Sequence, residues 1–225
     1  MSVEVRRALT WHQQDTIWGT ELREWVLTAF PQWEARAQDT FAFQAVSPGR
    51  EALFDFAMTY LFWYRRPDGS GKTASEHYFA CHSHLFEERR DWCKIHQASW
   101  LGIWLAQKID PGRGIQMVDI LTREQRYVYE RQGSKMGTLD HAYLARVVDL
   151  GDKLSVLSGA YPLLMSADAA ETARKNFLRF AYPRRRKVTP AELRHDDTFV
   201  VLSYMWTGVL AEYYPAYSNP LLPLR

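Results

Sequence analysis

The stretch from residue 174 to residue 194 carries a strong concentration of positive charge. It holds eight basic residues and one acid, so its formal charge is +7; because the whole chain carries +2, the remainder carries −5. Arginine and lysine bind phosphate and carboxylate groups, and neighbouring rings such as Phe177, Phe180 and Tyr182 can stack on nucleobases. The pattern predicts a surface for an acidic protein or a nucleic acid, with a plain solvated face as the remaining interpretation. The predicted binding residues are Arg174, Lys175, Arg179, Arg184, Arg185, Arg186 and Lys187.

A second group of residues with possible chemistry consists of histidines and cysteines between positions 77 and 96. His77 and Cys81 are four residues apart, and Cys93 and His96 are three apart, so each pair could share a helix face and the four could enclose a tetrahedral zinc ion. There is no Cys-x-x-Cys knuckle, and a bend in the chain would have to bring the pairs together. The alternatives are small buried cysteines in a helix core or a catalytic Cys/His pair. A metal-binding protein is therefore the second hypothesis.

Common catalytic and nucleotide-binding motifs are missing. The sequence has no Gly-x-Ser-x-Gly elbow and no His-Glu-x-x-His, and residues 69–73 match only the end of a phosphate loop. The segment 111–114 could bind an anion on its backbone N–H groups, but a glycine-rich hairpin is the commoner explanation. We therefore predict a non-catalytic binding protein or complex subunit that has no cofactor.

Composition indicates a folded globular protein. The chain has 225 residues, of which 47% are hydrophobic and 24% charged, and this excludes disorder as the dominant state. Two cysteines cannot form a disulfide framework and no signal-peptide pattern opens the chain, so we expect a cytoplasmic protein. The most apolar stretch, 52–64, is interrupted by Asp55 and is shorter than the roughly 20 residues of a membrane span. No membrane partner is expected.

The hydrophobic periodicity changes twice along the chain. Apolar residues at steps of three and four predict helices over 22–30, 49–64 and 74–97. From Ser99 onward, five short strands in about 60 residues predict a small curled antiparallel sheet or barrel. Beyond Gly159 the pattern is helical again. The predicted fold class is α+β, with a helical region over 1–98, a small antiparallel β-barrel-like segment over 99–160, and a helical C-terminal region with a basic linker over 161–225.

Several motifs of the strand region resemble one group of bacterial proteins. They occur in the order residues 108–115 (KIDPGRGI), 118–122 (VDILT), 129–134 (YERQGS), 143–148 (YLARVV) and 158–159 (SG). This order resembles the uncharacterised bacterial proteins that often carry a SEC-C zinc motif. The resemblance covers roughly residues 22–159. It implies a helical region followed by a small β segment, and it implies no activity.

Two departures from that group limit what the resemblance implies. The SEC-C motif needs three cysteines and a further cysteine or histidine, whereas this chain has two cysteines in all. A zinc or partner role tied to that motif is therefore not carried over. Arg123 stands where the group has glycine, so the hairpin there should use another turn geometry or a strained backbone.

Overall fold

The computed structural model describes residues 24, 47–66, 71–82, 90–136, 139–151 and 154–213. The chain divides into two compact units: residues 1–94 and 216–225 belong to the first, and residues 95–215 to the second. The helix predicted over 22–30 lies outside the described residues, apart from residue 24. Within the described ranges, no helix has both the length and the apolar character needed to cross a membrane.

The first unit contains the helices α4 (Ser47–Trp63) and α5 (Ala74–Cys81) and the start of α6 (Arg90–Ala98). The predicted helical region 74–97 is thus found as two helices, and residues 83–89 between them lie outside the description. A capping box begins α5, because the Thr73 hydroxyl accepts from the Glu76 N–H at 3.2 Å and the Glu76 carboxylate accepts from the Thr73 N–H at 2.8 Å. The buried side of α4 includes Leu53, Phe56, Ala57, Met58, Leu61 and Phe62.

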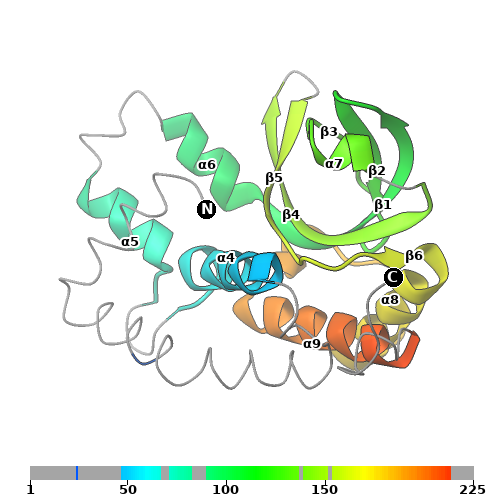
Figure 1. Cartoon of the computed structure of the whole chain (residues 1–225). Helices are drawn as coiled ribbons and strands as arrows, with labels where there is room; N and C mark the ends of the chain where they lie inside the picture. Colours follow the sequence, from blue (N-terminus) through cyan, green and yellow to red (C-terminus); the bar gives the residue numbers. More distant parts are fainter. Residues whose placement is uncertain are drawn as a thin grey trace. The chain divides into compact units, whose positions relative to one another are not determined.

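The second unit is built on a six-stranded sheet in which five strands close into a barrel (Figure 1). The strand order is β1-β2-β3-β5-β4-β6, and β1 also pairs with β4 to complete the ring. The α+β class is confirmed. One pairing, β3 with β5, is parallel through Val128 and Ser155, so the barrel is mixed and not wholly antiparallel. The strands are β1 (Trp100–Asp110), β2 (Gly114–Asp119), β3 (Gln125–Val128), β4 (His141–Gly151), β5 (Leu154–Ala160) and β6 (Met165–Ser166).

The connectivity of the five strands is that of an OB-type barrel. The long strand β1 pairs with β4 through its first half and with β2 through its second half, and a register shift lies between Ala106 and Lys108. A short helix, α7 (Gly133–Met136), follows β3 and precedes β4. Such barrels serve many functions, so the fold alone assigns none to this chain.

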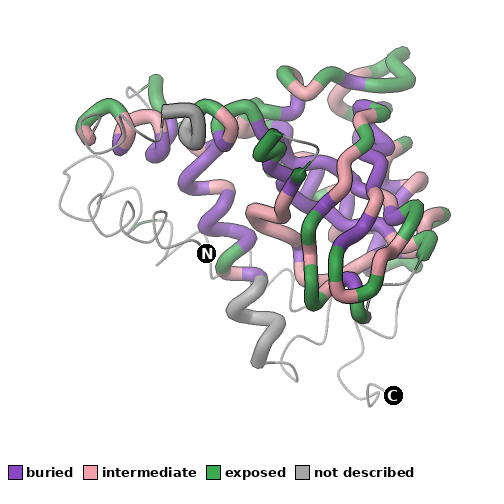
Figure 2. The backbone as a smooth tube through the Cα atoms, turned by 90° about the horizontal axis from the view of Figure 1, so that it is seen from above, coloured by how far each residue is buried: buried purple, intermediate pink, exposed green. Residues whose placement is uncertain are grey.

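A buried carboxylate organises the turn between β2 and β3. Asp119 is 0% exposed and accepts hydrogen bonds from Trp100 Nε1 at 2.8 Å, the Thr122 hydroxyl at 2.8 Å and the Leu121 N–H at 3.0 Å. Burial raises the pKa of Asp119 to about 6, although these donors act against the shift. Arg123 in the same turn has φ 73°, a backbone conformation that glycine adopts more readily than a residue with a Cβ. Figure 2 shows long buried stretches along the barrel strands.

The helices α8 (Ala167–Ala181) and α9 (Asp196–Tyr213) follow the barrel, with a short 3₁₀ helix η5 (Glu192–Arg194) between them. The Ser166 hydroxyl caps α8 by accepting from the Ala169 N–H at 3.4 Å. Thr172 and Tyr213 are joined through their hydroxyls at 2.9 Å, so the start of α8 lies beside the end of α9 and the two helices run antiparallel. The buried residues of α8 are Ala169, Ala170, Ala173, Phe177 and Leu178.

Candidate functional site

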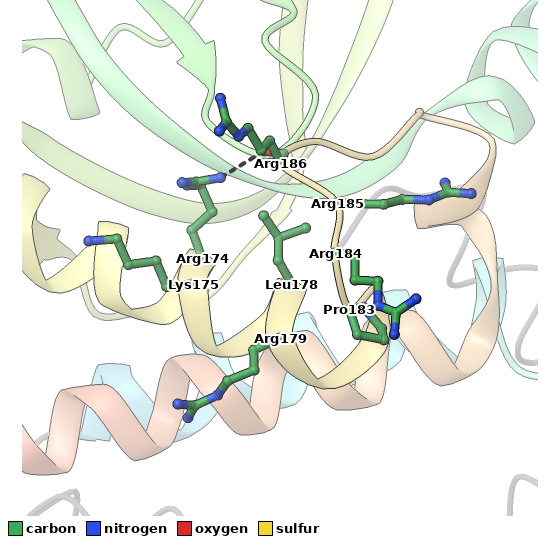
Figure 3. A pocket seen from close by; sticks show the side chains of 8 residues that line it. All are labelled: Arg174, Lys175, Leu178, Arg179, Pro183, Arg184, Arg185 and Arg186. Atoms are coloured by element: carbon green, nitrogen blue, oxygen red, sulfur yellow. Dashed lines mark hydrogen bonds between the residues drawn. The ribbon is translucent and has the colours of Figure 1, made fainter.

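Six of the seven basic residues predicted to bind a partner line one cleft of about 310 Å³ (Figure 3). The last two turns of α8 form one side of this basic cleft, and residues 183–186 form the other. The seventh residue, Lys187, follows directly and is exposed. The structure therefore brings residues ten positions apart onto one concave surface. The lining residues are Arg174, Lys175, Leu178, Arg179, Pro183, Arg184, Arg185 and Arg186.

The cleft forms because the chain reverses direction immediately after α8. The Tyr182 N–H donates to the Leu178 carbonyl at 2.9 Å and so closes the last turn of the helix. Pro183 follows, and the Arg185 N–H donates to the Tyr182 carbonyl at 3.1 Å in a turn that places Arg184 at φ 75°. Further on, the Val188 N–H donates to the Leu121 carbonyl at 3.1 Å. This bond attaches the chain directly after Lys187 to the β2–β3 turn of the barrel.

The charged ends of the lining residues surround an apolar centre. Leu178 is 5% exposed and lies in the middle of the view in Figure 3. Around it, the charged groups of Lys175, Arg179 and Arg184 point outward in different directions. The aliphatic parts of these side chains therefore line the cleft, and their charges form a ring at its rim.

Arg174 holds the two sides of the cleft together. Its guanidinium makes a bidentate ion pair with Glu171, with both nitrogen–oxygen distances at 2.7 Å, and donates to the Arg186 carbonyl at 2.9 Å. The hydrogen bonds from Arg174 lower the pKa of the Glu171 carboxyl, and the charges of Arg174, Lys175 and Arg123 act in the same direction. Arg174 is thus committed to internal contacts.

Arg185 is likewise bonded within the protein. Its guanidinium pairs with Glu192 and lies over the Tyr182 ring, 5.9 Å from the centroid. Glu192 also accepts from the Thr189 N–H and hydroxyl, each at 2.9 Å, and these bonds lower its pKa. The Thr189–Glu192 pair fixes the chain directly after the basic residues.

The other four cations of the cleft lack a close acidic partner among the described residues. Lys175 is 4.0 Å from Glu171, which Arg174 already binds, and Arg179 donates only to the Asn176 side-chain oxygen, at 3.3 Å. The side chains of Arg184 and Arg186 make no ion pair or hydrogen bond with another described residue. Six cations against the two carboxylates of Glu171 and Glu192 leave a local charge of +4.

No aromatic ring is available for stacking in the cleft. Phe177 is 0% exposed, and Tyr182 packs against it with 5.8 Å between ring centroids. Phe180 is 67% exposed, but it follows Leu178 by two positions and so projects from nearly the opposite side of α8, at about 100° per residue. The cleft offers charge without the stacking partner that the sequence suggested.

One cation near the cleft was missed by the sequence reasoning. Arg123 is exposed in the β2–β3 turn, two residues from the carbonyl that binds Val188, and its charge contributes to the lowered pKa of Glu171. It is 51 positions before Arg174, so charge counting along the chain could not connect the two.

The residues of the predicted zinc site lie in both units of the chain. In α5, the His77 Nε2 and Cys81 Sγ atoms are 3.6 Å apart. His96 is in the second unit, where its Nδ1 is 3.5 Å from Arg146 Nη1; burial lowers the pKa of His96 to about 3, and the charge of Arg146 acts in the same direction. The side chain of Cys93 lies outside the description. No group of three or more His, Cys, Asp or Glu side chains suited to a metal is found in the described part of the chain.

Comparisons with known proteins found no match to any family model, curated protein or solved structure.

Proposed function

We propose that this protein is a non-catalytic binding protein, or a subunit of a complex, that engages a polyanionic macromolecule through the basic cleft. The partner is either an acidic protein or a nucleic acid. The observation that supports this proposal is the ring of cations around one cleft, with a local charge of +4 after internal pairing. Such a concentration of one sign attracts and orients an oppositely charged partner.

A purely structural role would not account for the whole ring. Cations near a helix C-terminus stabilise the helix dipole, and this explains Arg179 in the last turn of α8. Arg184 and Arg186 come after the helix has ended, and their side chains bond to no other described residue. Their mutual repulsion is a cost to the folded state that a bound polyanion would remove.

The test compares two triple variants with the same loss of charge. Lys175→Ala/Arg184→Ala/Arg186→Ala removes rim cations but keeps Arg174 and Arg185, which hold the chain in place. The control, Lys108→Ala/Arg131→Ala/Lys135→Ala, removes three exposed cations outside the lining of the cleft. Binding to fluorescent duplex DNA and to poly-glutamate is measured over a range of salt concentrations.

The wild type and the control should bind at least one of the two polymers in a salt-dependent manner. The cleft variant should bind more weakly, with a log–log salt slope smaller by about 0.9 for each lost phosphate contact. Equal affinity of the two triple variants, or no binding by the wild type at low salt, would overturn the proposal.

The alternative function is zinc binding, for which His77 and Cys81 in α5 are the two predicted ligands whose side chains the structure brings together. One distance favours it: two ligands at about 2.3 Å (sulfur) and about 2.0 Å (nitrogen) from a tetrahedral ion stand about 3.5 Å apart, and His77 Nε2 and Cys81 Sγ are 3.6 Å apart. Metal content after native purification tests this, with Cys81→Ser as the variant and His82→Ala as the control. Zinc retained by the wild type and the control but lost by Cys81→Ser would support the alternative; a metal-free wild type that also takes up no added zinc would reject it.

A further inference from the structure

Backbone conformation singles out two arginines, one in the lining of the basic cleft and one in the β2–β3 turn of the barrel. Among the described residues other than glycine, only Arg123, Asp140 and Arg184 have a positive φ, at 73°, 61° and 75°. This left-handed conformation is unfavourable for a residue with a Cβ, and glycine adopts it freely. Strained positions of this kind cluster at functional sites. Both arginines occupy positions where glycine would give a more stable backbone.

Arg123 does not line the cleft itself, but it lies in the barrel turn to which the chain directly after Lys187 is bonded. Its N–H donates to the Asp119 carbonyl at 2.8 Å, which fixes the turn, and the neighbouring Leu121 carbonyl binds Val188. Its charge acts on Glu171, the partner of Arg174. Arg123 therefore adds a cation in the barrel turn that is bonded to Val188, while Arg184 adds one in the 183–186 segment that lines the cleft.

The directions of the charged groups distinguish an extended ligand from a compact one. In Figure 3 the ends of Lys175, Arg179 and Arg184 diverge, so they do not converge on one small anion. They are placed to contact separate charges on a surface that crosses the cleft. B-DNA carries one charge per about 1.7 Å of axis, whereas acidic side chains on one helix face are about 5–6 Å apart, so nucleic acid supplies the denser array.

The residue types that line the cleft favour contacts with phosphate groups and not with bases. Arg174 and Arg185 are bonded within the protein, and three of the other four cations in the cleft are arginines, whose planar guanidinium binds phosphate oxygens in a bidentate way. No exposed ring lines the cleft, and the Tyr182 ring is packed between Phe177 and Arg185. A single-strand site would need rings for stacking.

We propose that the partner is a double-stranded nucleic acid held through its phosphate backbone, and that Arg123 is a binding residue of this site together with the cations of the cleft. The proposal rests on the polyanion-binding function proposed above. The partner is then a nucleic acid duplex and not an acidic protein, and the barrel takes part in binding through Arg123.

The decisive variant is Arg123→Gly, because it changes stability and binding in opposite directions. Glycine removes the charge and also relieves the backbone, so the melting temperature should stay the same or rise. The affinity for a duplex of about 20 base pairs should fall several-fold, and the log–log salt slope should decrease by about 1. Arg123→Lys should keep most of the affinity.

Two controls separate strain from charge. Asp140→Gly gives the same backbone relief without removing a cation, and Arg131→Ala removes an exposed cation from a turn that is not part of the cleft. Both should leave the duplex affinity and the salt slope unchanged.

Three binding results would contradict the role of Arg123, the class of partner or the polyanion function separately. If Arg123→Gly binds duplex like the wild type, Arg123 is not a binding residue. If the wild type prefers single strands or poly-glutamate to duplex, the assigned class of partner is wrong, while the general polyanion function stands. If it binds none of the three, the proposed function itself fails.

Discussion

The barrel core and the basic cleft differ in how their charged side chains are bonded. Asp119 is 0% exposed, and three donors of the protein, from Trp100, Leu121 and Thr122, surround its carboxylate. Arg184 and Arg186 are exposed, and their side chains bond to no other described residue. The charge of Asp119 is satisfied internally, whereas the charges of Arg184 and Arg186 are left for solvent or a ligand.

This difference helps to separate structural from binding residues. A buried charge is tolerated only when its hydrogen bonds are made within the protein, so its removal should destabilise the fold. An exposed cation without a partner contributes little to stability, so its removal should alter only binding. Variants in the core and at the cleft test this division, and the largest expected change in stability is that of Asp119.

Replacing Asp119 by alanine should have the largest effect on stability. Trp100 Nε1, the Thr122 hydroxyl and the Leu121 N–H would lose their acceptor inside the barrel, and we expect a loss of about 4 kcal/mol in the free energy of unfolding. Urea unfolding followed by tryptophan fluorescence measures it. Arg186→Ala should change the same quantity by less than about 0.5 kcal/mol. Similar losses in the two variants would contradict the division between core and cleft.

The titration of Asp119 should also make the free energy of unfolding decrease as the pH rises. Its pKa is raised from 3.8 to about 6 in the folded state, so between these values the native state binds more protons than the unfolded state. The contribution of Asp119 to the free energy of unfolding should therefore fall by about 3 kcal/mol as the pH rises from about 4 to about 6, and then stay level.

The measurement is the difference between the wild type and Asp119→Asn in urea unfolding at several pH values. The difference is needed because His96, with its pKa lowered to about 3, contributes a stability that increases with pH over an overlapping range. A difference that does not change between pH 4 and 6 would show that Asp119 is not the group responsible.

Gly102→Ala should be less damaging than removal of Asp119. A Cβ at Gly102 would lie 2.8 Å from Asp119 Oδ2 and 2.9 Å from Trp104 Nε1, and both neighbours are buried. The expected loss is about 2 kcal/mol, measured by urea unfolding. Gly208→Ala in α9 is the control, because nothing lies within 4 Å of its Cβ and alanine favours a helix. If Gly102→Ala left the free energy of unfolding unchanged, the turn that contains Asp119 would have to be able to shift.

Local patterns in the sequence were sufficient to predict most of the elements. The change of pattern at Ser99 predicted the strands, and the return of a helical pattern beyond Gly159 predicted the region of α8 and α9. The parallel pairing of Val128 with Ser155 could not be predicted, because it depends on residues far apart in sequence. Local patterns fix elements, while the closure of a barrel is a property of the whole fold.

The candidate site was predictable in its residues but not in its geometry. The charge run identified the cations that line the cleft, but not that Glu171 and Glu192 would bind Arg174 and Arg185. It also could not show that Phe180 projects away from the cleft, since this depends on where α8 ends. The contact between Leu121 and Val188, which bonds the turn carrying Arg123 to the chain after the cleft, likewise cannot be read from the sequence.

The smallest expected effect concerns Glu171, which forms an ion pair with Arg174 of the cleft. Glu171→Gln removes one negative charge and weakens the bidentate pair with Arg174, which is partly exposed to solvent, so stability should fall by no more than about 0.5 kcal/mol. Binding of a duplex should become slightly tighter, because repulsion between the acid and the phosphates is removed and Arg174 becomes available. The change should be about two- to threefold at low salt and should vanish at high salt. A weaker complex would instead mean that the Arg174 bond to the Arg186 carbonyl depends on Glu171, so that the order of the 183–186 segment limits binding more than its charge.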